Sequence, residues 1–223
     1  MKLNIPDSSR AIPQALMQAL GTHPVKKQVE TFFKHIGYDP NMFSESDALA
    51  TFYTFRHYIE TEDVGKPPVK IKYNGITYFK PDDLLDMPLK FLVELVNIDI
   101  DIETKDFFYA VTALFYRKDW SRPFNKKEYL DGQKIFFDAP YIYSLYSLKL
   151  FNQLIVSLQN SYPVLYKGEQ KEQNDGRKMY SLIRTLANED ATKMAQAEDL
   201  EIWRAFSWME DVRIDEINKK NEQ

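Results

Sequence analysis

The chain has 223 residues, of which 44% are hydrophobic and 14% aromatic, so it is long enough to bury the core of one domain with a small appendage. Its formal net charge of -4 excludes the global positive field that draws proteins to nucleic acid or to anionic membranes. The absence of cysteine excludes disulfides, thiolate catalysis and cysteine-ligated metal sites, and it is typical of a chain made in a reducing cytoplasm.

Residues 1–22 are predicted to form an N-terminal arm or short helix. The first residues contain no apolar run of signal-peptide length, and no segment of the chain has the roughly 20 apolar residues that a membrane span needs. Pro13 occupies a favoured first helical position and Gly21 a favoured C-cap, which predicts a helix over residues 13–20. Its apolar side chains, Ile12, Leu16 and Leu20, would either pack on the rest of the chain or lie on an arm.

Residues 23–166 are predicted to form a helical core domain. Thr22 is placed to cap a helix over residues 24–36 that ends at Gly37, a second C-cap glycine. Ser44 and Asp47 have the spacing of a capping box, which predicts another helix over residues 45–59. Its apolar face consists of Leu49, Phe52, Tyr53, Phe55 and Ile59.

The hydrophobic period changes over residues 69–79. Apolar residues alternate with lysines up to Asn74-Gly75, and the alternation resumes with Ile76 and Tyr78. Asn-Gly is the preferred pair for a two-residue type I′ turn, so this segment predicts a β-hairpin. The predicted fold is therefore mainly α, a helical bundle-like domain with one inserted β-hairpin.

Helical periodicity returns after the hairpin. A helix is predicted from Pro81 to Val96, with Pro88 as a kink or a restart, and residues 97–103 alternate as a short strand or an extended connector would. A second helix is predicted over residues 105–117 and ends in a loop through Trp120. The longest pattern, residues 139–162, predicts the central core helix, which stops at Pro163.

The last part of the chain divides into an exposed loop and a C-terminal helical segment. Residues 167–176 contain no apolar side chain and cannot offset their ordering entropy by burial. Residues 177–223 contain two helical patterns, one over 178–187 and a longer one over 195–218. The stripe of the longer helix is made of Ile202, Phe206, Met209 and Val212.

The sequence contains no catalytic, cofactor or metal-binding motif that we can identify. No two of His23, His35 and His57 have the spacing of a zinc pair, and Thr104 stands where a calcium loop beginning at Asp99 requires glycine. No nucleophile elbow, Walker loop or dinucleotide fingerprint is present. We therefore predict no catalytic residues, no cofactor and no metal.

One local basic cluster interrupts the acidic chain. Its members are interleaved with Trp120 and Phe124, a mixture that can stack bases and neutralise phosphates. Acidic residues break the cluster, which argues against nucleic-acid binding and favours a loop that Trp120 anchors. The basic residues are Arg117, Lys118, Arg122, Lys126 and Lys127.

Aromatic side chains exceed what one face of a helix can bury, so some are expected at an interface, where such residues are enriched. Trp203 and Trp208 widen the stripe of the last long helix beyond one side. The possible partner-binding residues are Trp120, Tyr141, Tyr143, Tyr146, Trp203 and Trp208.

The order of motifs resembles a viral protein family. Residues 71–78, 81–84 and 87–91, followed by the aromatic run of residues 107–117, resemble helical tail-assembly and tail-associated proteins of bacteriophages. The aromatic, lysine-rich and cysteine-free style is similar to that of phages of Bacteroidetes hosts, including the crAss-like group. The resemblance covers roughly residues 70–165 and supplies no catalytic residues.

The resemblance implies a role in a virion. The chain would be a repeated, homo-oligomeric subunit of a neck or tail ring, assembled in the host cytoplasm, whose partners are other phage tail or neck proteins and not a membrane. Alternatively, it would be a tail-assembly chaperone that is not retained in the particle. An enzyme of a type without recognisable motifs is the third alternative.

Overall fold

The computed structural model describes residues 24–60, 63–97, 107–166 and 193–221, together with the single residues Leu16, Met17, Leu20, Ile183, Leu186, Ala187 and Asp190. Within this part of the chain most residues are helical, and one antiparallel two-stranded hairpin lies between the helices. The predicted mainly α fold with an inserted hairpin is confirmed.

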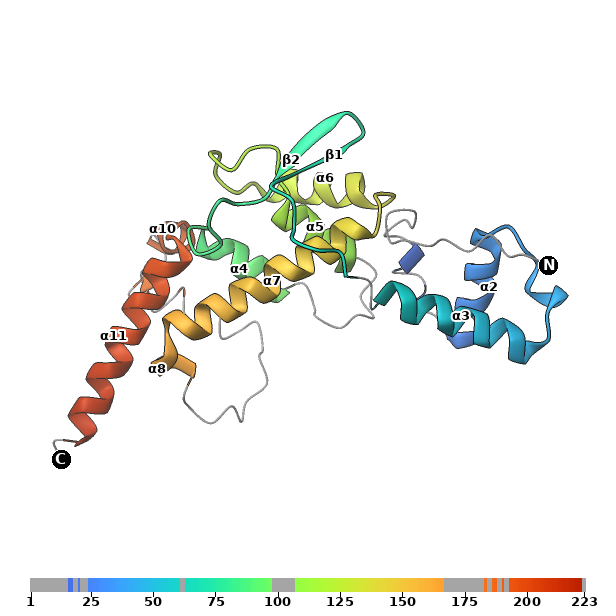
Figure 1. The fold of residues 1–223 in the computed structure, drawn as a ribbon. Coiled ribbons are helices and arrows are strands. Elements are labelled where there is room, and N and C mark those ends of the chain that lie inside the picture. Colours follow the sequence, from blue (N-terminus) through green and yellow to red (C-terminus); the bar gives the residue numbers. More distant parts are fainter. Residues whose placement is uncertain are drawn as a thin grey trace.

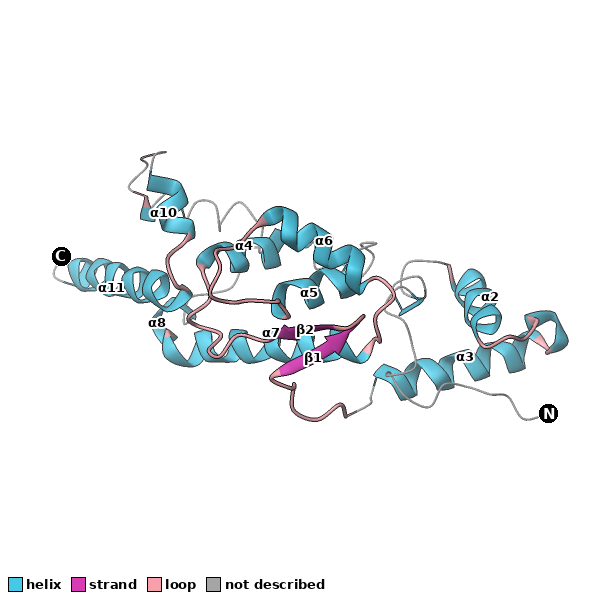
Figure 2. Ribbon diagram, turned by 90° about the horizontal axis from the view of Figure 1, so that it is seen from above, coloured by secondary structure: helices cyan, strands magenta, loops and turns pink. Residues whose placement is uncertain are grey.

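The elements form an elongated molecule. Figures 1 and 2 show α2 and α3 at one end, α11 at the other, and the remaining helices and the hairpin between them. In chain order the elements are α2 (Val25–His35), the 3-10 turn η2 (Pro40–Met42), α3 (Glu45–Glu60), β1 (Lys70–Tyr73), β2 (Ile76–Phe79), α4 (Leu89–Asn97), α5 (Phe107–Phe115), α6 (Lys126–Phe136), α7 (Ile142–Ser161), α8 (Pro163–Tyr166), α10 (Met194–Glu198) and α11 (Ile202–Asn221).

Helices α2 and α3 begin and end close to where their caps predict. Gly37 follows α2 with a φ of 79°, a left-handed conformation that glycine adopts without steric cost. The Ser44 hydroxyl accepts from the Asp47 backbone N–H at 3.1 Å, which confirms the capping box in front of α3. The two helices pack through buried aromatic rings, although Tyr53, expected on the apolar face, is exposed. The buried rings are Phe32, Phe33, Phe52 and Phe55.

The β-hairpin has the predicted turn. Asn74 and Gly75 both have positive φ, 48° and 76°, as a type I′ turn requires. Ile71 lies opposite Tyr78 in the register, and both side chains are buried on the inner face of the hairpin. The hairpin therefore covers the helices with one face and leaves the other to solvent.

Helix α5 forms the centre of the fold. Every residue from Phe108 to Arg117 is buried, and α5 packs against both α6 and α7. The Ser144 hydroxyl of α7 donates to the Phe108 carbonyl at 3.1 Å, so polar groups in this seam are paired. Gly132 of α6 faces Ala113, whose Cβ would lie 3.2 Å from a Cβ added at the glycine. The backbones of α5 and α6 therefore approach more closely than two larger residues would allow.

Two predicted helices are shorter in the structure than expected, and one contact explains both. Residues 81–87 are not helical, and α4 begins only after Pro88, which pairs with Glu201 in an isolated antiparallel bridge. On either side of the bridge, Leu89 N–H donates to the Leu200 carbonyl at 2.7 Å and Ile202 N–H donates to the Met87 carbonyl at 2.9 Å. These backbone N–H and carbonyl groups are hydrogen-bonded across the bridge and not within a helix. The helix predicted over 195–218 is therefore divided into α10 and α11.

Helices α6 and α7 add features that the sequence patterns did not predict. The predicted basic loop includes Lys126 and Lys127, but residues 126–136 form α6, whose Asn125 cap accepts from the N–H groups of Lys127 and Glu128 at 2.9 and 3.2 Å. In α7 the most buried apolar residues are Leu150, Leu154 and Leu158. Of the apolar residues at helical spacing in the predicted helix over 139–162, Leu158 and Tyr162 are buried, whereas Leu148 and Phe151 are half-buried.

Several predicted segments lie outside the described residues. These include residues 98–103, the loop over 167–176, and most of residues 1–22 and 177–192. Leu16, Met17 and Leu20 are helical and buried, as the first predicted helix requires. Ile183 and Leu186 are also helical.

In the part of the chain that the structure describes, no helix is both long and apolar enough to cross a membrane.

The close approach of α5 and α6 predicts the effect of enlarging Gly132. Gly132→Val should lower the free energy of unfolding by about 1–3 kcal/mol, because the new methyl groups overlap Ala113. Urea unfolding followed by circular dichroism measures this change. The double variant Gly132→Val/Ala113→Gly should recover part of the loss, and an unchanged stability in the single variant would contradict the packing described here.

Candidate functional site

The segment that follows α5 is hydrogen-bonded to the hairpin. Phe79 N–H donates to the Arg117 carbonyl at 2.7 Å, and Arg117 N–H donates back to the Phe79 carbonyl at 3.0 Å. The Trp120 indole N–H donates to the same Phe79 carbonyl at 2.7 Å. The edge of β2 is thus extended by a short segment that ends α5 after Phe115, two residues earlier than predicted.

The Arg117 side chain is buried among aromatic rings. Its guanidinium carbon lies 5.2 Å from the ring centroids of both Phe91 and Trp120, and only 8% of the side chain is exposed. Its nitrogens donate to the carbonyls of Arg122 and Pro123 at 3.4 and 3.2 Å. The buried cation is therefore stabilised by π faces and carbonyl oxygens.

Among the described residues, one carboxylate lies within 4 Å of this guanidinium. Glu128 of α6 lies 3.9 Å away and is partly exposed. Burial lowers the pKa of Arg117, while Glu128 and Asp119 oppose that shift. Since arginine remains charged throughout the physiological pH range, the site keeps its positive charge.

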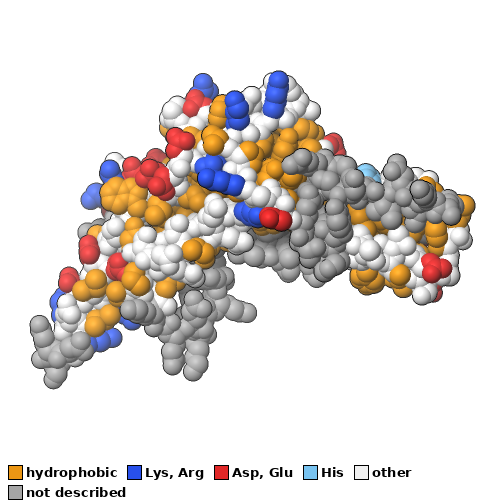
Figure 3. All heavy atoms as spheres, in the orientation of Figure 1, with side chains coloured by type: hydrophobic (Ala, Val, Ile, Leu, Met, Phe, Trp, Pro, Cys, Tyr) orange, Lys and Arg blue, Asp and Glu red, His pale blue; other side chains and the backbone are white. Residues whose placement is uncertain are grey.

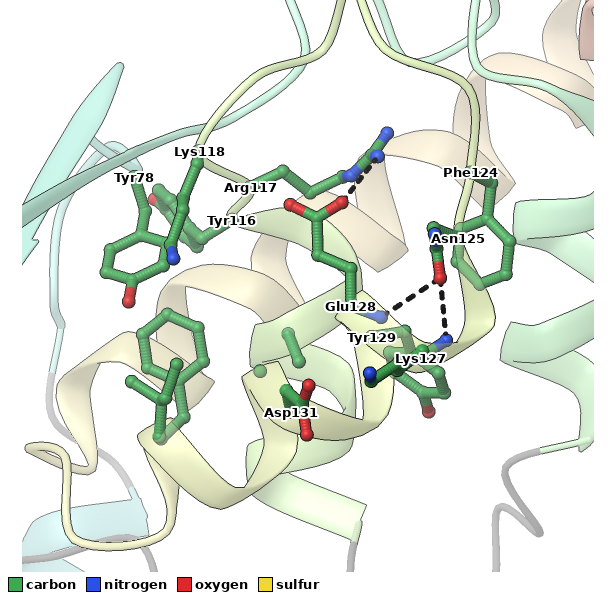
Figure 4. Close-up of a pocket in the computed structure, with 14 residues that line it drawn as sticks. Tyr78, Tyr116, Arg117, Lys118, Phe124, Asn125, Lys127, Glu128, Tyr129 and Asp131 are labelled. Carbon is green, nitrogen blue, oxygen red and sulfur yellow. Dashed lines mark hydrogen bonds and ion pairs between the residues drawn. The ribbon is translucent and has the colours of Figure 1, made fainter.

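An open pocket of about 260 Å³ lies beside Arg117, between α5, α6 and the hairpin. Figure 4 shows Arg117 and Glu128 on one wall and Tyr78 beside Lys118 on another. Apolar atoms line most of the pocket, while charges of both signs, including Asp131, line the remainder. Because both signs of charge are present, the pocket favours neither an anionic nor a cationic ligand.

The Tyr78 hydroxyl is an unusual feature of this pocket. It is buried and has no hydrogen-bond partner among the described residues. Burial raises the pKa of Tyr78, and nearby Tyr73 raises it further. The phenol therefore stays neutral at physiological pH.

The predicted basic cluster is divided between the interior and ion pairs. Arg117 is buried, Arg122 pairs with Asp119 at 3.2 Å, and Lys126 pairs with Glu94. Lys118 and Lys127 are exposed at the pocket. The five side chains do not form one continuous basic surface. Among the described residues, no group of three or more His, Asp or Glu side chains is placed to hold a metal ion.

Tyr141 and Tyr146, two of the possible partner-binding residues, are buried within the chain. They are only 4% and 9% exposed, and the Tyr141 ring packs edge-on against Phe108 at 5.0 Å. The start of α7 is covered by α5 on one side and by the hairpin on another. Tyr146 of α7 and Tyr141, which precedes the helix, are therefore covered within the chain.

Tyr143 and Trp120 are half-buried and serve mainly to hold the hairpin. The Tyr143 hydroxyl donates to the Lys72 carbonyl at 3.1 Å, just as the Trp120 indole bonds to β2. Trp120 also stacks near Phe91 at 5.1 Å, consistent with the predicted anchoring of its loop. Neither ring is free to supply its full surface to a partner.

Trp203 and Trp208 differ from the other four predicted residues because they are exposed, by 40% and 41%. Both belong to α11, whose first turns pack through Ile202, Ala205 and Phe206. Beyond these turns, every residue from Asp211 to Lys220 is exposed, including apolar ones. Figure 3 shows apolar side chains at the surface along this helix, and Figure 1 shows the helix extending away from the body.

The sequence stripe identified Val212 of this surface but not Ile214 and Ile217, which are each 39% exposed. The sequence contained a sign of this surface, because Ile214 and Ile217 are apolar residues that lie outside the stripe beginning at Ile202. A helix with apolar residues on more than one side either is buried all round or meets a partner. The exposed part of α11 is therefore the candidate functional site.

Comparison of the chain with protein-family models, with curated proteins and with solved structures gives no match.

Replacing Arg117 tests the importance of the buried cation. Arg117→Lys should lower the free energy of unfolding by about 2–3 kcal/mol, because an ammonium group cannot reproduce the planar stacking or reach both carbonyls. Arg122→Lys, at a 75% exposed side chain, should change it by about 0.5 kcal/mol or less. Equal effects of the two substitutions in urea unfolding would contradict a special role for Arg117.

Buried tyrosines predict a loss of stability at alkaline pH. Burial raises the pKa of Tyr116 above its ordinary value of 10.0, and the pKa of Tyr143 is raised for the same reason. The stabilisation is fully present below the unfolded pKa of about 10 and is lost as the pH rises toward the folded pKa. For Tyr116 the slope is at most about 1.4 kcal/mol per pH unit.

Urea unfolding between pH 8 and pH 11 measures this slope. Tyr116→Phe should cost about 1 kcal/mol at pH 8, because its hydroxyl donates to the Pro68 carbonyl, and should make the alkaline slope shallower. A variant whose slope matches that of the wild type would show that Tyr116 does not titrate as proposed.

Proposed function

We propose that the chain is a repeated structural subunit of a bacteriophage neck or tail ring and acts through protein–protein contacts. The observation that carries the proposal is the exposed second half of α11, where no residue from Asp211 to Lys220 is buried. The resemblance of residues 70–165 to phage tail-associated proteins supplies the biological context.

A helix segment that extends into solvent gains stability from a packing partner. Isolated helices shorter than about 12–15 residues are marginal in water, and most helical stability in proteins comes from packing an apolar face. Val212, Ile214 and Ile217 are exposed on this segment. Full burial of such side chains is worth about 1.5–3 kcal/mol each, so contact with another protein would stabilise the segment.

The interior of the protein supports a structural role for the remaining aromatic residues. Tyr141 and Tyr146 are buried, and Trp120 and Tyr143 bond to the hairpin. These contacts make a rigid body from which α11 extends. A rigid body with an exposed contact helix suits a subunit that must repeat in one geometry.

The proposal places the protein in the virion, assembled with other neck or tail proteins in the host cytoplasm. Quantitative mass spectrometry of purified particles should find the chain at several copies per particle, with the portal protein of the same particles as the internal copy standard. Light scattering of the purified chain should show a homo-oligomer.

Other outcomes would replace this proposal. A chain abundant in infected-cell lysate but absent from purified particles would support a tail-assembly chaperone. Absence from particles together with turnover of a substrate that depends on the pocket beside Arg117 would support an enzyme.

A further inference from the structure

The exposed part of α11 carries apolar side chains on two nearly opposite faces. Trp208 and Val212 form one face, and Ile214 and Ile217 form the other; their exposed fractions are 41%, 38%, 39% and 39%. With 3.6 residues per turn, the mean directions of the two pairs are about 170° apart around the helix. One packing partner can therefore cover only one of the two faces.

The Ile214–Ile217 face continues a surface that already packs against another helix within the chain. Positions 203, 207 and 210 precede 214 and 217 in alternating steps of four and three, which keeps them on one side of the helix. The Tyr162 hydroxyl donates to the Trp203 carbonyl at 2.9 Å, and the Ser207 hydroxyl lies 3.4 Å from the Tyr162 hydroxyl.

Helix α8 completes this contact. Val164 N–H donates to the Glu210 carboxylate at 2.9 Å. Helix α8 ends at Tyr166, and the same face of α11 then continues, exposed, through Ile214 and Ile217. The geometry for packing a helix on this face is therefore already present in the protein.

Two opposite apolar faces match the needs of a ring better than those of a dimer. A symmetric dimer joins the same face of both copies and leaves the opposite face in water. A head-to-tail ring gives each copy one neighbour on either side, and the two contact directions approach opposition as the number of copies grows. Where these helices run along the ring axis, rotation about that axis keeps equivalent helices parallel.

We infer that the Ile214–Ile217 face of one copy packs in parallel against the Trp208–Val212 face of α11 in the next copy. The occupant of each face is thus a second copy of this chain. The inference rests on the proposed ring function and adds the residues through which successive subunits join.

Paired cysteines test this contact directly, because the chain has no cysteine of its own. Positions 212 and 214 differ by about 3 Å along the helix axis, so neighbouring helices at the same height would bring them within reach of a disulfide. Disulfides join Cα atoms about 4.4–6.8 Å apart. Within one chain the two side chains point in opposite directions and cannot pair.

Mild oxidation of Val212→Cys/Ile214→Cys should give a ladder of dimers, trimers and larger species on a non-reducing gel, and reduction should return the monomer. Each single variant alone should remain monomeric on the gel, while a mixture of the two should give only dimers. The matched control is Asp211→Cys/Arg213→Cys, which has the same spacing on the charged edges between the two faces. It should give at least about tenfold less cross-linked product, and circular dichroism verifies that both double variants are folded.

The possible failures separate the contact from the function. A product that stops at dimers, or Ile214→Cys alone forming dimers, would show self-pairing of one face and would overturn the head-to-tail contact. No cross-link in Val212→Cys/Ile214→Cys, with a wild-type chain that is oligomeric by light scattering, would place the contact elsewhere and leave the ring function intact. A wild-type chain that is monomeric and missing from particles would overturn both.

Discussion

The buried guanidinium of Arg117 is the interaction on which the arrangement of the central body depends. It lies between rings from α4 and from the loop after α5, and it donates to two carbonyls of that loop. Its backbone pairs with β2, so one residue joins α4, α5, the hairpin and the approach to α6. A buried charge is costly unless it is hydrogen-bonded or paired, and here the surrounding structure can provide those contacts only if the loop, the hairpin and α4 hold their places together.

This dependence explains how the aromatic residues are divided between the interior and the surface. Tyr141 and Tyr146 are buried in the body, and the polar atoms of Trp120 and Tyr143 bond to carbonyls of the hairpin. Trp203 and Trp208 lie on α11, whose buried residues, among those that the structure describes, all belong to its first turns. Exposed apolar side chains also occur elsewhere, as at Val69 and Val156, but five of them follow one another along α11. This group on a single helix supports the proposed role in assembly.

Sequence patterns were reliable where local chemistry decides the structure. Asn74-Gly75 specifies its turn because both residues need positive φ, and Ser44 with Asp47 satisfies free N–H groups at the start of α3 within a few residues of chain. The patterns were unreliable where distant segments compete for the backbone. The bridge between Pro88 and Glu201 delays α4 and divides the predicted C-terminal helix, and neither local sequence contains a sign of the other. Helix α6 was recognisable from Asn125 and Glu128, which have the spacing of a capping box, but the lysines beside them suggested a basic loop.

The sequence by itself determined the mainly helical class, the hairpin and its turn, because hydrophobic period and turn residues act over a few positions. It also placed Trp203 and Trp208 on a helix whose apolar residues exceed one face. Only the tertiary structure decided which aromatic residues remain exposed. Tyr141 and Trp208 are both aromatic residues in predicted helical segments. In the structure Tyr141 is covered by neighbouring elements and Trp208 is exposed. Exposure depends on which segments pack against a helix from elsewhere in the chain, and periodicity within the helix carries no information about them.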